Sequence, residues 1–184
     1  MKFNYQPALA ILAAFLLQTT LAPHMRVAGV QPDFLLIVVV VYGFLEGPVV
    51  GSVCGFSAGL LQDMLLVTTL GLNALSKTVL GYLSGMIEQN LFSENFVMPM
   101  LAIFSATLLN ESIVLALRAT LGESISLVVA MRSIAVPAAI YNALLAGLVY
   151  PVLARLLRRE TRTESRSAEL TGSFGPTLQR VRKK

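Results

Sequence analysis

Residues 5–157 consist of long apolar stretches separated by short polar turns, and this pattern constrains the fold more than any other feature of the sequence. Residues of the Ala, Val, Ile, Leu, Met, Phe, Trp, Tyr and Cys set make up 55% of the chain, and charged residues only 13%. A soluble domain carries about 25% charged residues. The mean hydropathy is +0.73. This composition excludes an ordinary cytosolic enzyme, a disordered protein and a disulfide scaffold, and it is typical of a membrane protein.

The apolar stretches predict an all-α fold, a polytopic membrane protein whose six transmembrane helices form a compact bundle. The expected spans are 5–22, two spans within 32–62, then 70–87, 96–117 and 127–157. Glu46, Gly47 and Pro48 combine a charge with a proline, so we expect a turn between the second and third spans. Both spans are short, and one re-entrant hairpin over 32–62 is the alternative, which leaves five spans. Pro137 is expected to kink the last span.

Positive charge is concentrated after the last apolar stretch. Residues 1–154 hold five Lys or Arg and seven acidic residues, whereas residues 155–184 hold nine Lys or Arg and three acidic residues. The positive-inside rule places such a tail in the cytoplasm, and six spans place both termini there. We expect a transmembrane domain over 1–157 and a basic, largely disordered cytoplasmic tail over 158–184. The basic residues expected at the membrane surface are Arg155, Arg158, Arg159 and Arg162.

Glycine recurs at every fourth position across the second and third predicted spans, and the same spacing appears in the fourth. The residues expected on packing faces are Gly51, Gly55 and Gly59 of the third span and Gly81 and Gly85 of the fourth. Because lipid provides no hydrophobic drive between helices, helices in a bilayer associate through close backbone approach, which glycine permits. The pattern therefore predicts tightly packed helices.

Small residues of this kind have two interpretations. The first is packing inside the bundle, which we favour for the glycines. The second is a face for the helix of a partner protein, for which Ala10 and Ala14 of the first span are the better candidates.

Four charged residues are expected to form a buried polar layer near the outer side of the bundle. At 1.5 Å per residue, Lys77 and Glu111 lie roughly 10 Å below the outer boundary of the membrane. Arg132 lies at a similar depth, and Asp63 closes the third helix near the same side. We expect Lys77 to form a salt bridge with Glu111 or Asp63. The alternatives are a pocket for a lipid headgroup or small solute, open to the outside, and snorkelling of Lys77 and Arg132 to the interface.

Asp63 has two interpretations of its own. It can cap the join between the third and fourth helices by accepting backbone N–H groups near Leu65 and Leu66. It can also be a polar contact for a partner. We favour the cap.

No catalytic, metal or cofactor site is expected. His24 is the one histidine and Cys54 the one cysteine, which is too few for a metal cluster or a disulfide. The sequence contains no Walker loop, no dinucleotide fingerprint and no nucleophile with a matching base. We expect a protein that is not an enzyme, and no nucleic-acid partner, because no globular domain is present to carry a reading surface.

Several short motifs occur together in the first half of the chain. They are Gln-Pro-Asp-Phe-Leu-Leu at 31–36, Gly-Phe-Ser-Ala-Gly-Leu-Leu-Gln-Asp at 55–63, Leu-Gly-Leu-Asn-Ala-Leu at 70–75 and Gly-Tyr-Leu-Ser-Gly at 81–85. In this order they resemble the signature of the rod shape-determining MreD family, over roughly residues 30–87. That family is distantly similar to the substrate-binding subunits of ECF vitamin transporters, which are six-helix bundles.

The resemblance implies a non-enzymatic subunit of the bacterial cell-elongation complex, which synthesises peptidoglycan, in the cytoplasmic (inner) membrane. It implies MreC-like, RodA-like and class B penicillin-binding proteins as partners, with MreB as a further partner at the cytoplasmic face and the lipid bilayer around the helices. The competing hypothesis is the substrate-binding subunit of a membrane transporter, with an outward-facing polar pocket.

Overall fold

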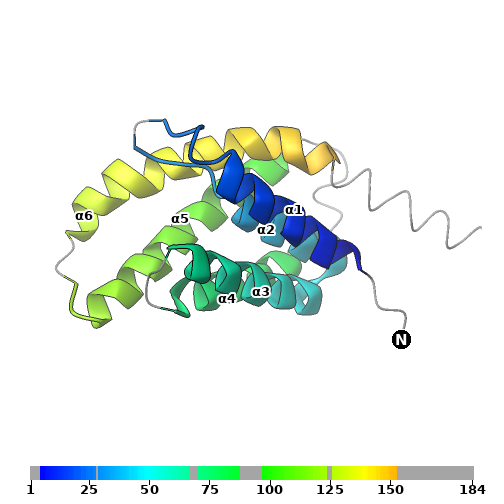
Figure 1. Cartoon of the computed structure of the whole chain (residues 1–184), viewed down its shortest axis with the longest axis horizontal. Helices are drawn as coiled ribbons and strands as arrows, with labels where there is room; N and C mark the ends of the chain where they lie inside the picture. Colours follow the sequence, from blue (N-terminus) through cyan, green and yellow to red (C-terminus); the bar gives the residue numbers. More distant parts are fainter. Residues whose placement is uncertain (1–4, 28, 67–69, 88–96, 124–125, 153–184) are drawn as a thin grey trace, which may run out of the picture. The chain divides into compact units, whose positions relative to one another are not determined.

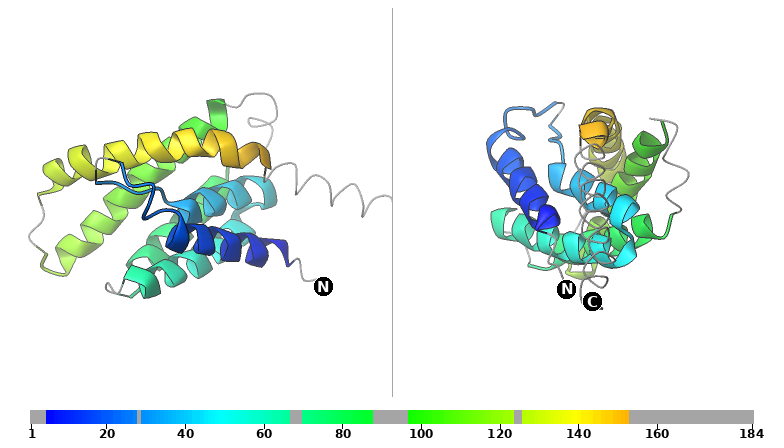
Figure 2. Two further views of the ribbon diagram at one scale, coloured as in Figure 1. Left: turned by 45° about the horizontal axis from the view of Figure 1, so that its top comes forward. Right: turned by 90° about the vertical axis from the view of Figure 1, so that its right-hand side faces the viewer.

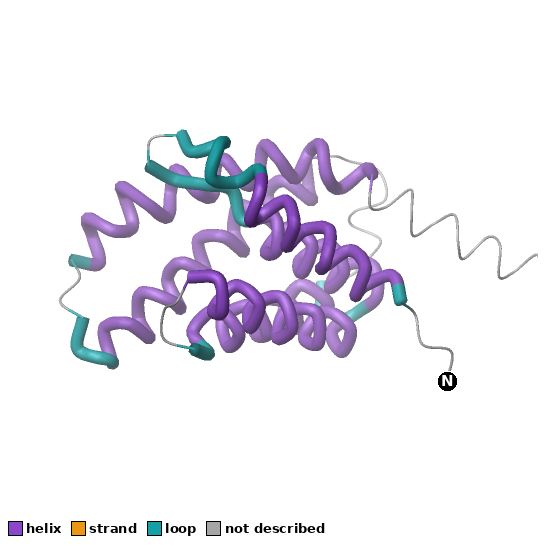
Figure 3. The backbone as a smooth tube through the Cα atoms, viewed as in Figure 1, coloured by secondary structure: helices purple, strands orange, loops and turns teal. Residues whose placement is uncertain are grey.

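The computed structural model describes residues 5–27, 29–66, 70–87, 97–123 and 126–152, and within these ranges it contains helices and no β-strand (Figures 1 and 3). Val27 and Val30 form an isolated bridge. The helices are α1 (Gln6–Thr20), α2 (Phe34–Glu46), α3 (Pro48–Leu66), α4 (Leu72–Gly85), α5 (Val97–Thr120) and α6 (Leu127–Ala130), and a π turn (Met131–Ala135) joins α6 to a helical segment at 136–152.

Helix α2 forms the centre of the fold. Every residue from Phe34 to Phe44 is buried, as expected of a helix that is apolar on all sides. Helices α1, α3, α4 and α5 all pack against it, and Figure 2 shows α1 and α5 on opposite sides of it. The expected turn at 46–48 is confirmed, because α2 ends at Glu46 and Gly47 adopts a φ of 90°, which favours glycine.

Helices α3 and α4 pack at backbone distance along their whole shared length. A Cβ atom added at Gly51 would overlap the carbonyl of Gly81. One added at Gly55 would overlap the carbonyl of Lys77, and one added at Gly59 would overlap the backbone of Ala74. These pairs run in antiparallel register, and Gly85 continues the series against the backbone of Gly47 and Pro48. The spacing of four thus places each glycine one turn further along the same contact.

A wide turn interrupts the last helix immediately before Pro137. Met131–Ala135 form a π turn, in which the Val136 N–H bonds to the Met131 carbonyl. A proline has no N–H with which to bond the preceding turn, and a π turn is one of the ways in which a helix accommodates this loss. The kink expected at Pro137 itself stays a prediction.

Three helices are long and apolar enough to cross a membrane: Pro48–Leu66, Val97–Thr120 and Val128–Val152. Helices α2 and α4 have 13 and 14 residues, which at 1.5 Å per residue is about 20 Å, against a hydrocarbon core of about 30 Å. The helical content and the apolar spans fit a membrane protein, but the six-span bundle is not confirmed.

The described residues lie almost entirely in one unit, Met1–Tyr150. The basic residues Arg155, Arg158, Arg159 and Arg162, and the tail that follows, lie outside the described residues.

Candidate functional site

A buried ion pair joins the beginning of α2 to the middle of α4. The Lys77 side chain is 0% exposed, and its Nζ lies 2.6 Å from Oδ2 of Asp33, which is 15% exposed. Asp33 is also the N-cap of α2, where its Oδ1 accepts the Leu36 N–H at 2.9 Å. A buried ammonium needs a paired anion, so this pair fixes α2 and α4 to each other.

The predicted partner of Lys77 was wrong, because the salt bridge forms with Asp33 and not with Glu111 or Asp63. Glu111 is partly buried and lies within electrostatic range of Lys77 and Asp33, but Asn110 is the side chain that bonds it, at 3.3 Å. Sequence reasoning missed Asp33. The signal that could have identified it is an aspartate directly before an unbroken apolar run, which is an N-cap pattern.

Arg132 does not join the buried layer. It belongs to the π turn and its side chain is exposed. Counting residues inward from the helix end placed it at the depth of Lys77, but depth along a helix does not fix which face a residue occupies, and Arg132 lies on the outer face.

Asp63 caps α4, as the favoured interpretation expected, but through other donors. Its two carboxylate oxygens accept the backbone N–H groups of Gly71, Asn73 and Ala74 and the side-chain amide of Asn73, at 2.8–3.1 Å. The three backbone N–H groups are among those at the start of a helix that have no partner within it. The predicted donors near Leu65 and Leu66 belong to the last turn of α3, which carries Asp63, and not to α4, which Asp63 caps.

Replacing Asp63 by Asn is expected to lower the free energy of unfolding by about 1–2 kcal/mol, because an amide NH2 would face an N–H donor and the negative charge at the helix N-terminus would be lost. Denaturation of the purified protein in mild detergent measures this. Glu123→Gln, which changes an exposed carboxylate, is the matched control. Equal stability of Asp63→Asn and Glu123→Gln would contradict the capping role.

Buried polar side chains extend from the ion pair across the bundle. The Asp33 N–H donates to Oδ1 of Asn142 at 2.9 Å, and Nδ2 of Asn142 donates to Thr107 at 3.3 Å. The Ser76 hydroxyl donates to Oδ1 of Asn110 at 2.8 Å. Each bond joins two helical segments, so the polar groups of α2, α4, α5 and the last helix fix their relative positions.

A cavity of about 610 Å³ lies beside the ion pair. It is lined by the C-terminal parts of α1, α3 and α5, by the connection between α1 and α2 up to the N-cap Asp33, by the N-terminal part of α4, and by the beginning of the last helix. Its charged and amide-bearing residues include Gln18, Arg26, Asp33, Gln62, Glu111 and Arg118. Oε1 of Gln62 is buried and accepts no hydrogen bond.

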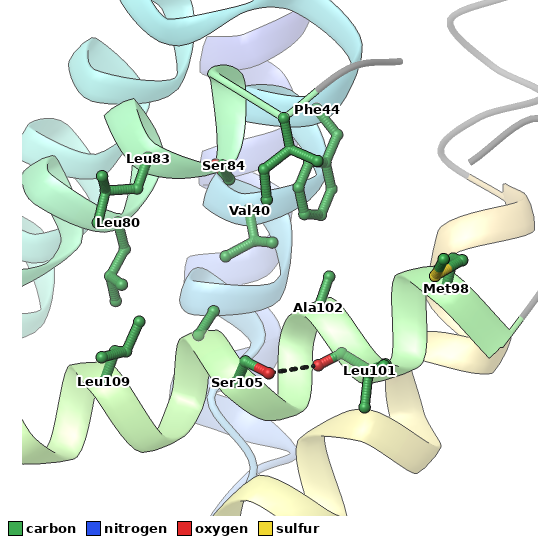
Figure 4. A pocket seen from close by; sticks show the side chains of 12 residues that line it. Val40, Phe44, Leu80, Leu83, Ser84, Met98, Leu101, Ala102, Ser105 and Leu109 are labelled. Carbon is green, nitrogen blue, oxygen red and sulfur yellow. Dashed lines mark hydrogen bonds between the residues drawn. The ribbon is translucent and has the colours of Figure 1, made fainter. Parts of the chain in front are cut away.

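Two apolar grooves lie elsewhere on the helices. One, of about 280 Å³, is formed by α2, α4 and α5, and Figure 4 shows Val40, Phe44, Leu80 and Leu109 around it. The other, of about 560 Å³, lies between α1 and α3.

Of the two small residues of α1 predicted to meet a partner, Ala14 is 3% exposed and faces the protein's own helices. Ala10 is partly buried, and its contact with a partner stays a prediction. The exposed face of α1 includes Leu9, Leu12 and Leu16.

In the described part of the chain, no three His, Cys, Asp or Glu side chains come together in a way that could hold a metal ion. Cys54 is a free, buried thiol on α3.

Comparison with known proteins identifies the family. The sequence model of the family described as rod shape-determining protein MreD matches residues 1–160. No curated protein and no solved structure matches the chain, and the predicted similarity to ECF transporter subunits finds no support. A match over most of the sequence makes this chain a member of the MreD family, whose proteins are membrane components that determine rod shape.

Proposed function

We propose that this protein is a non-enzymatic scaffold subunit of the cell-elongation complex in the bacterial inner membrane. In this role it binds MreC-like, RodA-like and class B penicillin-binding proteins through its helices. Its tail reaches MreB at the cytoplasmic face. Membership of a family of shape-determining membrane proteins is the observation that carries the proposal.

The groove between α1 and α3 is the surface that best suits a partner's transmembrane helix. Its lining is apolar or small, and includes Ala8, Ile11, Val49, Val53 and Ser57. Val49 and Val53 are 73% and 62% exposed. Small side chains allow a second helix to approach closely, and association in lipid depends on such close packing.

The directions of the helices support an orientation with both termini in the cytoplasm. Each helical segment that lines the cavity does so with one of its ends. For α1 and the last helix, the other ends, which are the start of α1 and the end of the last helix, lie away from the cavity. The Arg-rich tail follows that last helix, and positive charge of this density remains on the cytoplasmic side. The cavity then faces the outside.

Replacing Val53 by Trp is expected to reduce recovery of the partner about tenfold or more, because an indole would fill the groove and a loss of about 1.4 kcal/mol is already tenfold in affinity. Val129→Trp is the matched control, since Val129 has the same 62% exposure but lies on α6. The measurement is the amount of MreC-like protein that co-purifies in mild detergent. An equal effect of the two variants would contradict docking at this groove.

Identification of the proteins that co-purify with the unmodified chain tests the proposed function itself. Recovery of MreC-like and RodA-like proteins supports the scaffold. Recovery of ATPase subunits in their place supports the transporter hypothesis and contradicts the scaffold.

A further inference from the structure

We propose that the 610 Å³ cavity binds a zwitterionic ligand, an ammonium group joined to a phosphate, as in the headgroup of phosphatidylethanolamine. The site does not depend on the proposed scaffold role, because it is formed by one chain alone.

The cavity presents charges of both signs that are not neutralised by salt bridges within the described part of the chain. Lys77 and Asp33 pair with each other. Glu111, Arg26 and Arg118 also line the cavity but form no salt bridge with any described residue. A ligand with one positive and one negative group can satisfy both kinds of charge, whereas a simple anion or cation can satisfy only one.

The positions of these groups orient the ligand. Glu111 and Arg118 lie two turns apart on α5, a separation of roughly 10 Å along the axis. Arg118 is in the last turn of α5 and Arg26 is in the connection after α1, so the cationic groups gather toward the end of the bundle. The phosphate therefore lies toward that end and the ammonium lies deeper, near Glu111.

The deep cationic group of the ligand is a hydrogen-bond donor, because the Glu111 carboxylate that lines the cavity is an acceptor. Gln62 also lines the cavity, but its Nε2 already donates to Oδ2 of Asp33 at 3.4 Å. An ammonium N–H can donate to Glu111, whereas the trimethylammonium group of choline has no N–H to donate.

The apolar part of the lining suits an amphiphile. Leu65, Leu66 and Ile134 line the cavity and are 38%, 46% and 48% exposed. The acyl-linked part of a lipid would cover these side chains. A soluble compound with the same zwitterionic group shares the polar contacts but leaves the leucines uncovered.

The test compares lipid binding to the full chain in nanodiscs made mainly of phosphatidylglycerol. Tightly bound lipid is measured by native mass spectrometry as phosphatidylethanolamine or phosphatidylcholine with matched acyl chains is added. We expect the ethanolamine lipid to bind about tenfold or more tightly, because charge-assisted hydrogen bonds of this kind are each worth about a factor of ten. Equal binding of the two lipids would overturn the proposal.

Two variants and two matched controls locate the site. Glu111→Gln is expected to remove the preference for ethanolamine, and Arg118→Gln to weaken both lipids about tenfold. Glu46→Gln and Arg132→Gln change exposed charges outside the cavity and are expected to bind like the unmodified chain. Loss of binding in the controls to the same extent would overturn the assignment.

Soluble phosphoethanolamine distinguishes the two sources of the ligand. Competition with the lipid at similar concentration identifies the zwitterionic group alone as sufficient. Persistence of the lipid preference without competition identifies a phospholipid as the ligand. Both results support the site, and the comparison of ethanolamine with choline remains the measurement that can refute it.

Discussion

Replacing Asp33 by Asn is expected to lower the free energy of unfolding by about 3–5 kcal/mol. The asparagine side chain keeps an oxygen that can accept the Leu36 N–H, so the cap of α2 survives. The Lys77 ammonium, however, remains at 0% exposure without its anion. Leaving a charge buried and unpaired is costlier than losing the ion pair itself. Equilibrium unfolding in mixed detergent, followed by circular dichroism, measures the change.

A second variant separates the cost of the unpaired charge from other effects. The double variant, Asp33→Asn with Lys77→Met, carries neither charge of the ion pair. Its methionine side chain fills most of the volume of the lysine. We expect it to recover most of the lost stability. Glu46→Gln, at an exposed position, should change stability by no more than about 0.5 kcal/mol. A double variant as unstable as Asp33→Asn alone would show that the ion pair is not the cause.

Local features of the fold could be predicted from the sequence because local chemistry determines them. The turn at 46–48 follows from a proline and a glycine that needs a positive φ. The capping role of Asp63 follows from an aspartate at the end of a helix, followed by a short connection. Neither conclusion requires knowledge of which helices are neighbours.

The position of α2 and the partner of Lys77 could not be predicted in the same way. Both depend on the order of helices around the core, which no local pattern encodes. The sequence prediction counted the depth of Lys77 from the end of its own predicted span, and left open whether residues 32–62 form two short spans or one re-entrant hairpin. Helix α2 has 13 residues, which is too few to cross the whole hydrocarbon core. Its N-cap Asp33 therefore lies inside the protein, at the level of Lys77. Charge and spacing identified Lys77 as buried, but only the packing of α2 identifies its anion.

Replacing Gly55 by Ala is expected to destabilise the protein by about 3 kcal/mol, at the upper end of what overpacking costs. The new Cβ would overlap the Lys77 carbonyl and lie within 2.9 Å of the Cα of Thr78. Because both neighbours are backbone atoms, no side chain can move aside, and α3 and α4 must separate. This separation would also displace Lys77 from Asp33.

Gly147→Ala is the control that distinguishes this contact from a general effect of alanine in a helix. Gly147 lies in the last helical segment, and its added Cβ would meet Met100, whose sulfur is 3.3 Å away. A methionine side chain is flexible, and alanine favours a helix over glycine by about 1 kcal/mol. We therefore expect Gly147→Ala to be neutral or slightly stabilising in the same unfolding measurement. If Gly55→Ala were equally well tolerated, α3 and α4 would not be in backbone contact, and the role assigned to the glycine spacing would be wrong.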